Sequence, residues 1–171
     1  MEQTLLQRLI DESDIRDVIH RYAESIDRRR WEALQTCFAD AIEADFTRAG
    51  IKEIFRGASQ DWIAGMKATN LGMDSTLHQI SNVRIQVKGD TATGSSVFHV
   101  TNLLANPAGD SHYIVNGFYD YEFRRIGGEW RIARYTGTMH QRMGNTYLFK
   151  LAHARGEKLL KQQAQQQQQQ A

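Results

Sequence analysis

The sequence has little cysteine, proline or net charge, and each shortage excludes a class of protein. Its 171 residues include one cysteine, Cys37, and one proline. A single thiol cannot form an intrachain disulfide or supply a zinc site that needs several thiolates. Lys and Arg number 21 against 20 Asp and Glu, a formal net charge of +1. Because this balance offers nothing for a polyanion to bind, we expect neither nucleic acid nor a membrane as a partner.

Long apolar runs and the common cofactor motifs are also missing. No stretch approaches the ~18 apolar residues of a transmembrane helix, and Met1–Gln3 does not resemble the start of a secretory signal. We therefore expect a cytoplasmic protein. Gly127 and Gly128 lie between two predicted strands, where they cannot form a phosphate loop before a helix. No His-x-x-x-His or Glu-x-x-His pair lies on a predicted helix, so we expect no metal and no cofactor.

The length fits one domain of ordinary size. No internal repeat or Gly/Ser linker divides the chain, so residues 1–161 are predicted to form a single domain. Residues 162–171 differ, because eight of these ten residues are glutamine. Such a run has nothing apolar to bury. We expect it to be a disordered tail or a fraying extension of the preceding helix.

The first half of the chain favours helices with short strands between them. Five apolar residues recur at the spacing of one face of an amphipathic helix: Ile15, Val18, Ile19, Tyr22 and Ile26. Ser13 or Asp14 is the predicted N-cap of this helix. The further elements predicted here are a helix over 31–38, strands over 41–47 and 51–55, and a helix that Ser59 caps.

The second half favours four long strands and a final helix. The strands are predicted over 76–87, 91–105, 112–126 and 129–142, and the helix over 145–161. Tight turns between them are too short for parallel crossovers, so neighbouring strands should be antiparallel. Helices followed by a sheet predict the α+β class. The third strand is partly apolar on both faces, which indicates a concave face around a cavity and a second face covered by a helix or another subunit.

Asp27 and His78 are the strongest candidates for chemistry. A carboxylate that accepts a hydrogen bond from one imidazole nitrogen fixes the tautomer, and the other nitrogen can then act as a base. Asp27 ends the first helix, and His78 lies between apolar residues on the first long strand. The alternative interpretations are an ion-paired helix end before Arg28–Arg30 and a core histidine. Tyr22 can line the same cavity or simply be part of the core.

Four more polar residues lie on predicted strands. His99 and Asn102 are on the second long strand, and His140 and Arg142 are at the end of the fourth. The rim of a cavity is where contacts with a substrate gather, so these residues are candidates for substrate binding.

Three segments carry a family resemblance. Residues 22–31 resemble the first-helix signature of the SnoaL-like group of the nuclear transport factor 2-like superfamily. Residues 76–85 are similar to the histidine strand of that group, and residues 119–132 resemble its closing hairpin. Together they span about residues 10 to 142. The resemblance implies a cystatin-like, cone-shaped sheet, antiparallel or mixed, whose N-terminal helices help to enclose a deep apolar pocket.

The resemblance also implies roles for particular residues. Scytalone dehydratase, hexachlorocyclohexane dehydrochlorinase and bile acid 7α-dehydratase, which belong to this group, use an Asp–His pair at the positions of Asp27 and His78. Tyr22 matches a tyrosine of the bile acid enzyme, whereas the dehydrochlorinase has a lysine there.

Three polar positions of these relatives differ in this sequence. The second histidine and the asparagine of scytalone dehydratase fall near Asn102 and Tyr119, which become candidates for substrate contact. The last-strand arginine of the bile acid enzyme has no exact counterpart, because the matching position falls near His140, with Arg142 close by.

These observations predict a cofactor-independent lyase of the dehydratase or dehydrohalogenase type. Its substrate would be small and largely apolar, either cyclic or aromatic. His78 would remove a proton, and Tyr22 with His140 or Arg142 would bind the developing negative charge. An isomerase or polyketide cyclase of the same fold is one alternative. A non-catalytic binding module or the small subunit of a ring-hydroxylating dioxygenase is another. We also expect a homo-oligomer, either a trimer or a dimer.

Overall fold

The chain folds as helices, then a sheet, then one long helix. The computed structural model describes residues 4–107 and 109–170. Within them the elements are α1 (Leu5–Asp27), α2 (Trp31–Gln35), β1 (Phe38–Asp45), a 3-10 turn (Thr47–Ala49), β2 (Phe55–Ala58), α3 (Ser59–Gly72), β3 (Ser75–Lys88), β4 (Thr91–Leu103), β5 (His112–Ile126), β6 (Glu129–Gly144) and α4 (Leu148–Gln170).

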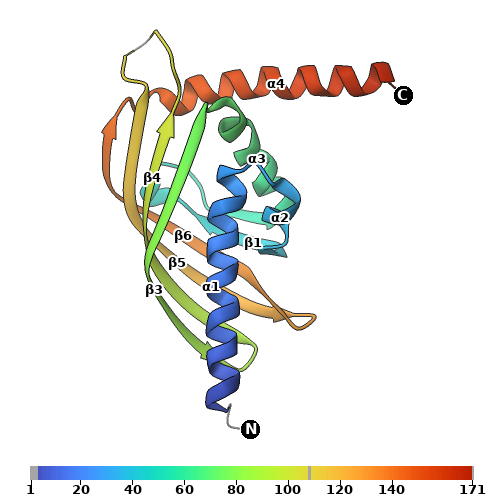
Figure 1. Ribbon diagram of the computed structural model, residues 1–171, viewed down its shortest axis with the longest axis vertical. Coiled ribbons are helices and arrows are strands. Elements are labelled where there is room, and N and C mark those ends of the chain that lie inside the picture. Colours follow the sequence, from blue (N-terminus) through green and yellow to red (C-terminus); the bar gives the residue numbers. More distant parts are fainter. Residues whose placement is uncertain (1–3, 108, 171) are drawn as a thin grey trace.

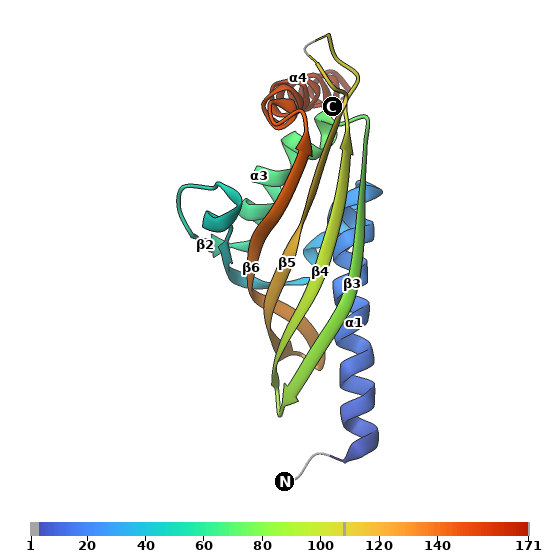
Figure 2. The same cartoon turned by 90° about the vertical axis from the view of Figure 1, so that its left-hand side faces the viewer.

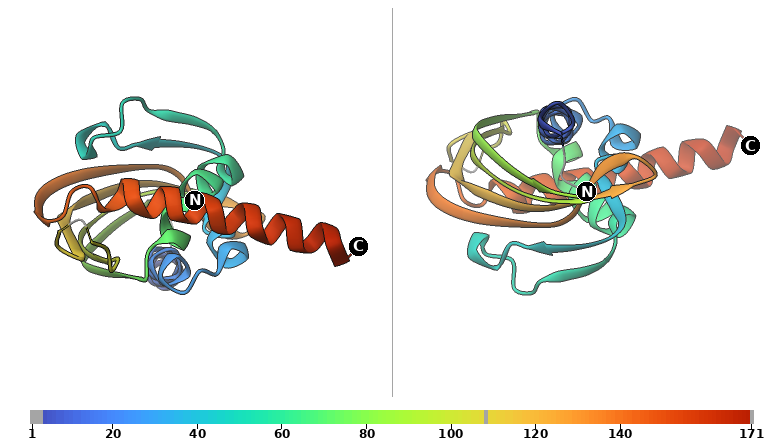
Figure 3. Two further views of the ribbon diagram at one scale, coloured as in Figure 1. Left: turned by 90° about the horizontal axis from the view of Figure 1, so that it is seen from above. Right: turned by 90° about the horizontal axis from the view of Figure 1, so that it is seen from below.

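One curved sheet holds the strands together in the order β2-β1-β6-β5-β4-β3. β1 is parallel to β6, and every other neighbouring pair is antiparallel. Helix α1 runs beside β3, and α2 and α3 lie on the same side of the sheet (Figures 1 and 2). Helix α4 crosses one end of the molecule and projects beyond it (Figure 3). The predicted α+β class is therefore confirmed, with a mixed sheet that stays unclosed.

The alternation of side chains along β5 decides which face is the core. Its inward residues are buried, and its outward residues are largely polar. Two register shifts in the β5–β6 pair add to the curvature of the sheet. The inward residues of β5 are Tyr113, Val115, Gly117, Tyr119, Tyr121 and Phe123. Gly117 allows a close approach, because a Cβ there would overlap the carbonyl oxygen of Thr138 and the ring of Phe98.

Helix α1 is longer than predicted. It begins at Leu5, and the Thr4 hydroxyl accepts a hydrogen bond from the backbone N–H of Gln7 at 3.2 Å. The predicted caps at Ser13 and Asp14 are therefore wrong. The prediction failed because the core-facing stripe starts only at the third turn. The first two turns place leucine and isoleucine side chains in solvent, which gives no amphipathic signal.

Two predicted boundaries in the first half were also misplaced. The strand predicted over 51–55 is β2, which begins at Phe55, because the chain first makes a 3-10 turn and a loop before it can pair with β1. The helix predicted over 31–38 ends at Gln35, and β1 starts at Phe38. The glutamine-rich segment continues α4 as far as Gln170.

An unpredicted buried carboxylate ties α1 to the β5–β6 hairpin. Asp11 is fully buried, and its Oδ1 lies 2.7 Å from an Arg125 guanidinium nitrogen. The same oxygen accepts hydrogen bonds from Gln7 Nε2 at 3.1 Å and Trp130 Nε1 at 3.3 Å. Burial by itself raises the pKa of Asp11, but the hydrogen bonds and the Arg125 charge outweigh it and hold that pKa below its usual value.

Helices α3 and α4 cross at backbone contact because both carry small residues one turn apart. Ala68 and Gly72 on α3 face Ala152 and Gly156 on α4, and all four are buried. A Cβ on Gly156 would overlap the carbonyl oxygen of Ala68, and one on Gly72 would overlap that of Ala152. This crossing fixes the start of α4 over one end of the sheet. No helix in the described part of the chain is long and apolar enough to span a membrane.

The crossing predicts opposite effects for two glycine-to-alanine changes. Gly156→Ala should lower the free energy of unfolding by about 1–3 kcal/mol, because overpacking outweighs the gain in helix propensity. Gly65→Ala, on α3 with open space around the new methyl group, should raise it by roughly 0.5–1 kcal/mol. Urea unfolding followed by circular dichroism measures both. Stabilisation by Gly156→Ala would contradict the close crossing.

Candidate active site

The Asp27 carboxylate and the His78 imidazole form a hydrogen-bonded pair. Asp27 is the last residue of α1, and His78 is the fourth residue of β3. His78 Nδ1 lies 2.7 Å from Asp27 Oδ1, and the backbone N–H of His78 donates to Asp27 Oδ2 at 2.7 Å. The hydroxyl of Thr76 donates to Asp27 Oδ1 at 2.9 Å. The predicted pair therefore meets, at the junction between the first helix and the edge strand.

The surroundings of the pair favour the ionised form of Asp27 and one tautomer of a neutral His78. The side chains of His78 and Asp27 are 9% and 14% exposed. Burial by itself raises the pKa of Asp27, but the hydrogen bonds and charge of His78, together with the Thr76 hydrogen bond, hold it below its usual value. An ionised carboxylate can only accept, so the neutral imidazole must carry its proton on Nδ1. His78 Nε2 then has a lone pair, and no hydrogen bond to it is found among the described residues.

His78 lines a cavity of about 690 Å³, partly open to solvent, between the sheet and the helices α1 and α3. The lining is mostly aliphatic and aromatic and contains no lysine or arginine. Its aromatic members are Tyr22, Phe46, Phe55, Trp62, Phe98, Tyr119, Tyr135 and Phe149. The only carboxylate among the lining residues is that of Asp61, which is exposed.

Three tyrosines line the cavity that His78 lines. The hydroxyls of Tyr22 and Tyr135 lie 3.0 Å apart, and the ring of Tyr119 packs edge-on against Tyr22. Burial raises the pKa of Tyr22 and Tyr135 well above the usual value, and raises that of Tyr119 to about 12. These phenols therefore stay protonated at neutral pH. Sequence reasoning missed Tyr135, because a register shift between Ile132 and Arg134 moves the inner face of β6 from the even to the odd residues.

Two of the predicted substrate contacts also line the cavity. Asn102 is buried on β4, and its side-chain amide donates to the carbonyl of Tyr113 at 3.0 Å. Tyr119 stacks on Phe98 with 4.3 Å between the ring centroids. One amide hydrogen of Asn102 is therefore already used in a hydrogen bond within the sheet. Tyr119 presents a ring face to the interior.

The other three predicted contacts lie outside the cavity. His99 is on the outer face of β4, because its neighbours Phe98 and Val100 point inward. His140 is exposed and packs against Phe118 on the outer face of β5, opposite a register shift that interrupts the alternation of β6. Arg142 is exposed and is not among the lining residues. The structure thus gives the cavity no cation at the end of the last strand.

The dyad separates the cavity from a groove on the outside of the molecule. This groove, of about 480 Å³, runs between α1 and β3. Asp27 and His78 both line it, with His20, Glu24 and Arg28 from α1. His78 thus borders both spaces, whereas Asp27 borders only the groove.

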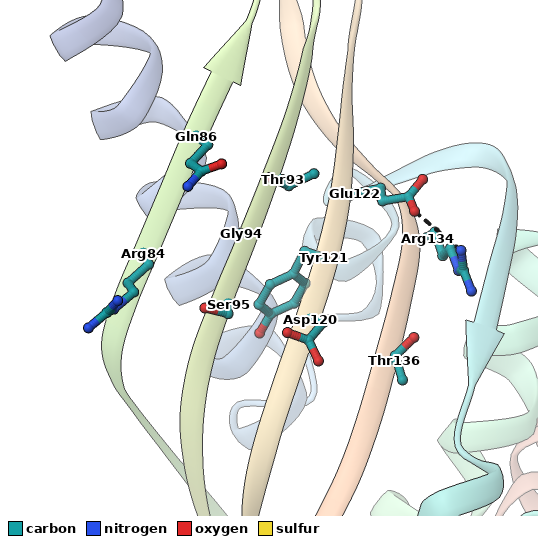
Figure 4. Close-up of a pocket in the computed structure, with 10 residues that line it drawn as sticks. All are labelled: Arg84, Gln86, Thr93, Gly94, Ser95, Asp120, Tyr121, Glu122, Arg134 and Thr136. Atoms are coloured by element: carbon teal, nitrogen blue, oxygen red, sulfur yellow. Dashed lines mark hydrogen bonds and ion pairs between the residues drawn. The ribbon is translucent and has the colours of Figure 1, made fainter.

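A second depression lies on the opposite face of the sheet, away from the dyad (Figure 4). Its charged lining residues are Arg84, Asp120, Glu122 and Arg134, and it contains neither Asp27 nor His78. Glu122 and Arg134 point toward each other and bond at 3.2 Å, and Arg134 also lies 3.0 Å from Glu43. Among the described residues, no group of three or more His, Cys, Asp or Glu side chains could hold a metal ion. The inner cavity is therefore the candidate active site.

Residues 7–136 match the SnoaL-like domain, and the chain belongs to that family. A Kribbella flavida protein, Kfla4162, is similar in structure, with a TM-score of 0.78 and 22% identity over 84% of this chain and 99% of that one. The LinA-type3 hexachlorocyclohexane dehydrochlorinase of Novosphingobium barchaimii gives 0.68 and 19% over 84% and 95%. A candidate scytalone dehydratase from Novosphingobium aromaticivorans gives 0.68 and 19% over 81% and 89%. No curated protein sequence matches the chain.

The lowered pKa of Asp27 predicts a pH-dependent contribution to stability. A carboxylate whose pKa is lower in the folded state stabilises the fold above its unfolded pKa of about 3.9, and this contribution is lost as the pH falls through the folded value. Asp27→Asn should therefore lower the free energy of unfolding by about 1–3 kcal/mol at pH 7, and the deficit should shrink toward pH 3.

Urea unfolding of both proteins between pH 7 and pH 3 measures this difference. Asp40→Asn removes one exposed carboxylate from β1 and controls for the change in net charge. A deficit that stays constant across the whole pH range would contradict the account of the Asp27 carboxylate.

Proposed function

We propose that the protein is a cofactor-independent lyase that eliminates water or halide from a small, uncharged, ring-shaped substrate. The observation that carries the proposal is the 2.7 Å hydrogen bond between Asp27 and His78 at the wall of an apolar cavity. Membership of the SnoaL-like family and the similarity to a dehydrochlorinase and a candidate scytalone dehydratase support elimination over other uses of the same base.

In the proposed step, His78 Nε2 takes a proton from a carbon next to a carbonyl or to a carbon that bears the leaving group. The C–H electron pair forms the new double bond, and the bond to hydroxide or halide breaks. The imidazolium that results is stabilised by the ionised Asp27 carboxylate. It then gives its proton to the departing hydroxide, which leaves as water, or to solvent when the leaving group is halide.

The tyrosine pair supports stabilisation of the developing negative charge. Tyr22 and Tyr135 together carry two hydroxyl hydrogens, and one hydrogen suffices for the bond between them. The other can be donated to the hydroxyl of Tyr119 or, in exchange, to a carbonyl oxygen or a leaving group inside the cavity. Because burial raises both pKa values, the hydroxyls remain donors at neutral pH.

The composition of the lining supports an uncharged substrate. A carboxylate or phosphate moved into this cavity would lose its hydration and find no lysine or arginine among the lining residues. The aromatic side chains Phe46, Phe55 and Trp62 instead offer flat surfaces for a ring. The exposed carboxylate of Asp61 among these residues further disfavours an anion.

Replacement of the base should abolish turnover without unfolding the protein. His78→Gln should lower kcat/KM by at least about 10³-fold, and Tyr22→Phe by about 10- to 100-fold. The assay offers β-hydroxy cyclic ketones and polychlorinated cycloalkanes, and follows enone absorbance or chloride release. His99→Gln, on the outer face of the same sheet, is the matched control and should keep full activity. Wild-type turnover by His78→Gln on any substrate that the protein accepts would refute the proposal.

A further inference from the structure

Two residues outside the cavity lining, Thr76 and Arg29, form hydrogen bonds that lead to Asp27. Thr76 is two residues before His78 on β3 and is 6% exposed. Arg29, half-buried just after the end of α1, places Nη1 at 2.8 Å from Thr76 Oγ1. Neither residue is among those that line the cavity. A role in the chemistry could therefore only be exerted through Asp27.

Donor and acceptor chemistry fixes the direction of the hydrogen bonds that join Arg29, Thr76 and Asp27. A guanidinium group can only donate, so the Arg29–Thr76 bond uses a lone pair of the threonine oxygen. The single hydroxyl hydrogen of Thr76 must then point elsewhere, and Asp27 Oδ1 lies 2.9 Å away. The order is Arg29 to Thr76 to Asp27, in which Thr76 and the ring of His78 both donate to the same carboxylate oxygen. This arrangement stabilises the ionised form of Asp27.

The backbone of Arg29 gives an independent indication. Its φ of 60° lies in the left-handed region, which costs a residue with a side chain more free energy than it costs glycine. Its Nη1 also donates to the carbonyl of Ile26 at 2.6 Å. The flanking Arg28 and Arg30 differ, since both are exposed and pair only with the surface carboxylate of Glu24. Arg28 lines the outer groove beside the dyad, but of the three consecutive arginines the described hydrogen bonds connect only Arg29 to Asp27 through Thr76.

We propose that Arg29 and Thr76 are positioning residues that hold the Asp27 carboxylate ionised and aimed at His78 Nδ1. They thereby keep His78 in the tautomer whose Nε2 is free to act as a base. The inference deepens the proposed function, on which its catalytic meaning rests. The arrangement of protons that it specifies is a property of the resting protein and can be measured without any substrate.

The test is nitrogen-15 and carbon-13 NMR of the full-length protein, which reports the tautomer of His78 and the pKa of the Asp27 carboxyl. In the wild type, His78 should carry its proton on Nδ1. Thr76→Val removes the hydroxyl at nearly constant volume, and it should raise the pKa of Asp27 by about one unit and shift the tautomer toward Nε2–H. Thr76→Ser keeps the hydroxyl and should restore both values.

Arg29→Gly removes the guanidinium but suits the left-handed backbone, so the fold should survive the change. It should alter the tautomer and raise the pKa of Asp27 in the same direction as Thr76→Val. Arg30→Gln removes an equal charge from an exposed side chain one residue away, outside the groove that the dyad lines, and should change neither. An unaltered tautomer and Asp27 pKa in folded Thr76→Val and Arg29→Gly would overturn the inference. Elimination assays on the same variants report separately on the proposed function, because a failure to find turnover leaves the NMR result standing.

Discussion

The hydrogen bonds that the Asp27 carboxylate accepts are the constraint on which the rest of the site depends. They bring the C-terminal end of α1 to the start of β3, because the carboxylate binds both the ring and the backbone N–H of His78. That contact fixes the orientation of the imidazole at the cavity wall. It also fixes the rotation of α1 about its axis, so that Tyr22 presents its hydroxyl to Tyr135 across the cavity. The ionised Asp27 carboxylate therefore orients both the candidate base, His78, and the candidate hydrogen-bond donor, Tyr22.

The distribution of charge explains why this arrangement suits acid–base chemistry. No lysine or arginine lines the cavity, and its one lining carboxylate, that of Asp61, is exposed; the other polar groups of the lining include neutral phenols and amides among aromatic rings. In such surroundings an unpaired charge is costly, and a proton transfer between two neutral partners needs a nearby counter-charge. Asp27 supplies that counter-charge for His78 from the far side of the ring. The groove outside α1 leaves the pair in contact with solvent while the cavity is occupied.

Much of this account follows from local patterns, and the exceptions have physical reasons. The four long strands were predictable, because alternation carries that information along the chain. The meeting of Asp27 with His78 was expected because the segments that hold them resemble the SnoaL-like group. His140 was misjudged because a register shift in β6 changes the face on which it lies, and no turn residue marks the shift. Asp11 and the Gly72–Gly156 contact depend on partners more than 80 residues away, which spacing alone does not reveal. The sequence does not show which of the three consecutive arginines contacts Thr76, because only the folded geometry distinguishes Arg29 from its neighbours.

The central claim is that His78 abstracts a proton from carbon inside the cavity. Exchange of hydrogen for deuterium tests it most directly, because exchange reports proton abstraction whether elimination, isomerisation or mere binding follows. Neutral cyclic ketones incubated with the protein in deuterium oxide can be followed by proton NMR at the carbon next to the carbonyl. The account predicts that the wild-type protein accelerates exchange for at least one ketone that binds, and that His78→Gln loses the acceleration. Ketones that bind in the cavity without any acceleration of exchange, or equal acceleration by His78→Gln, would contradict it.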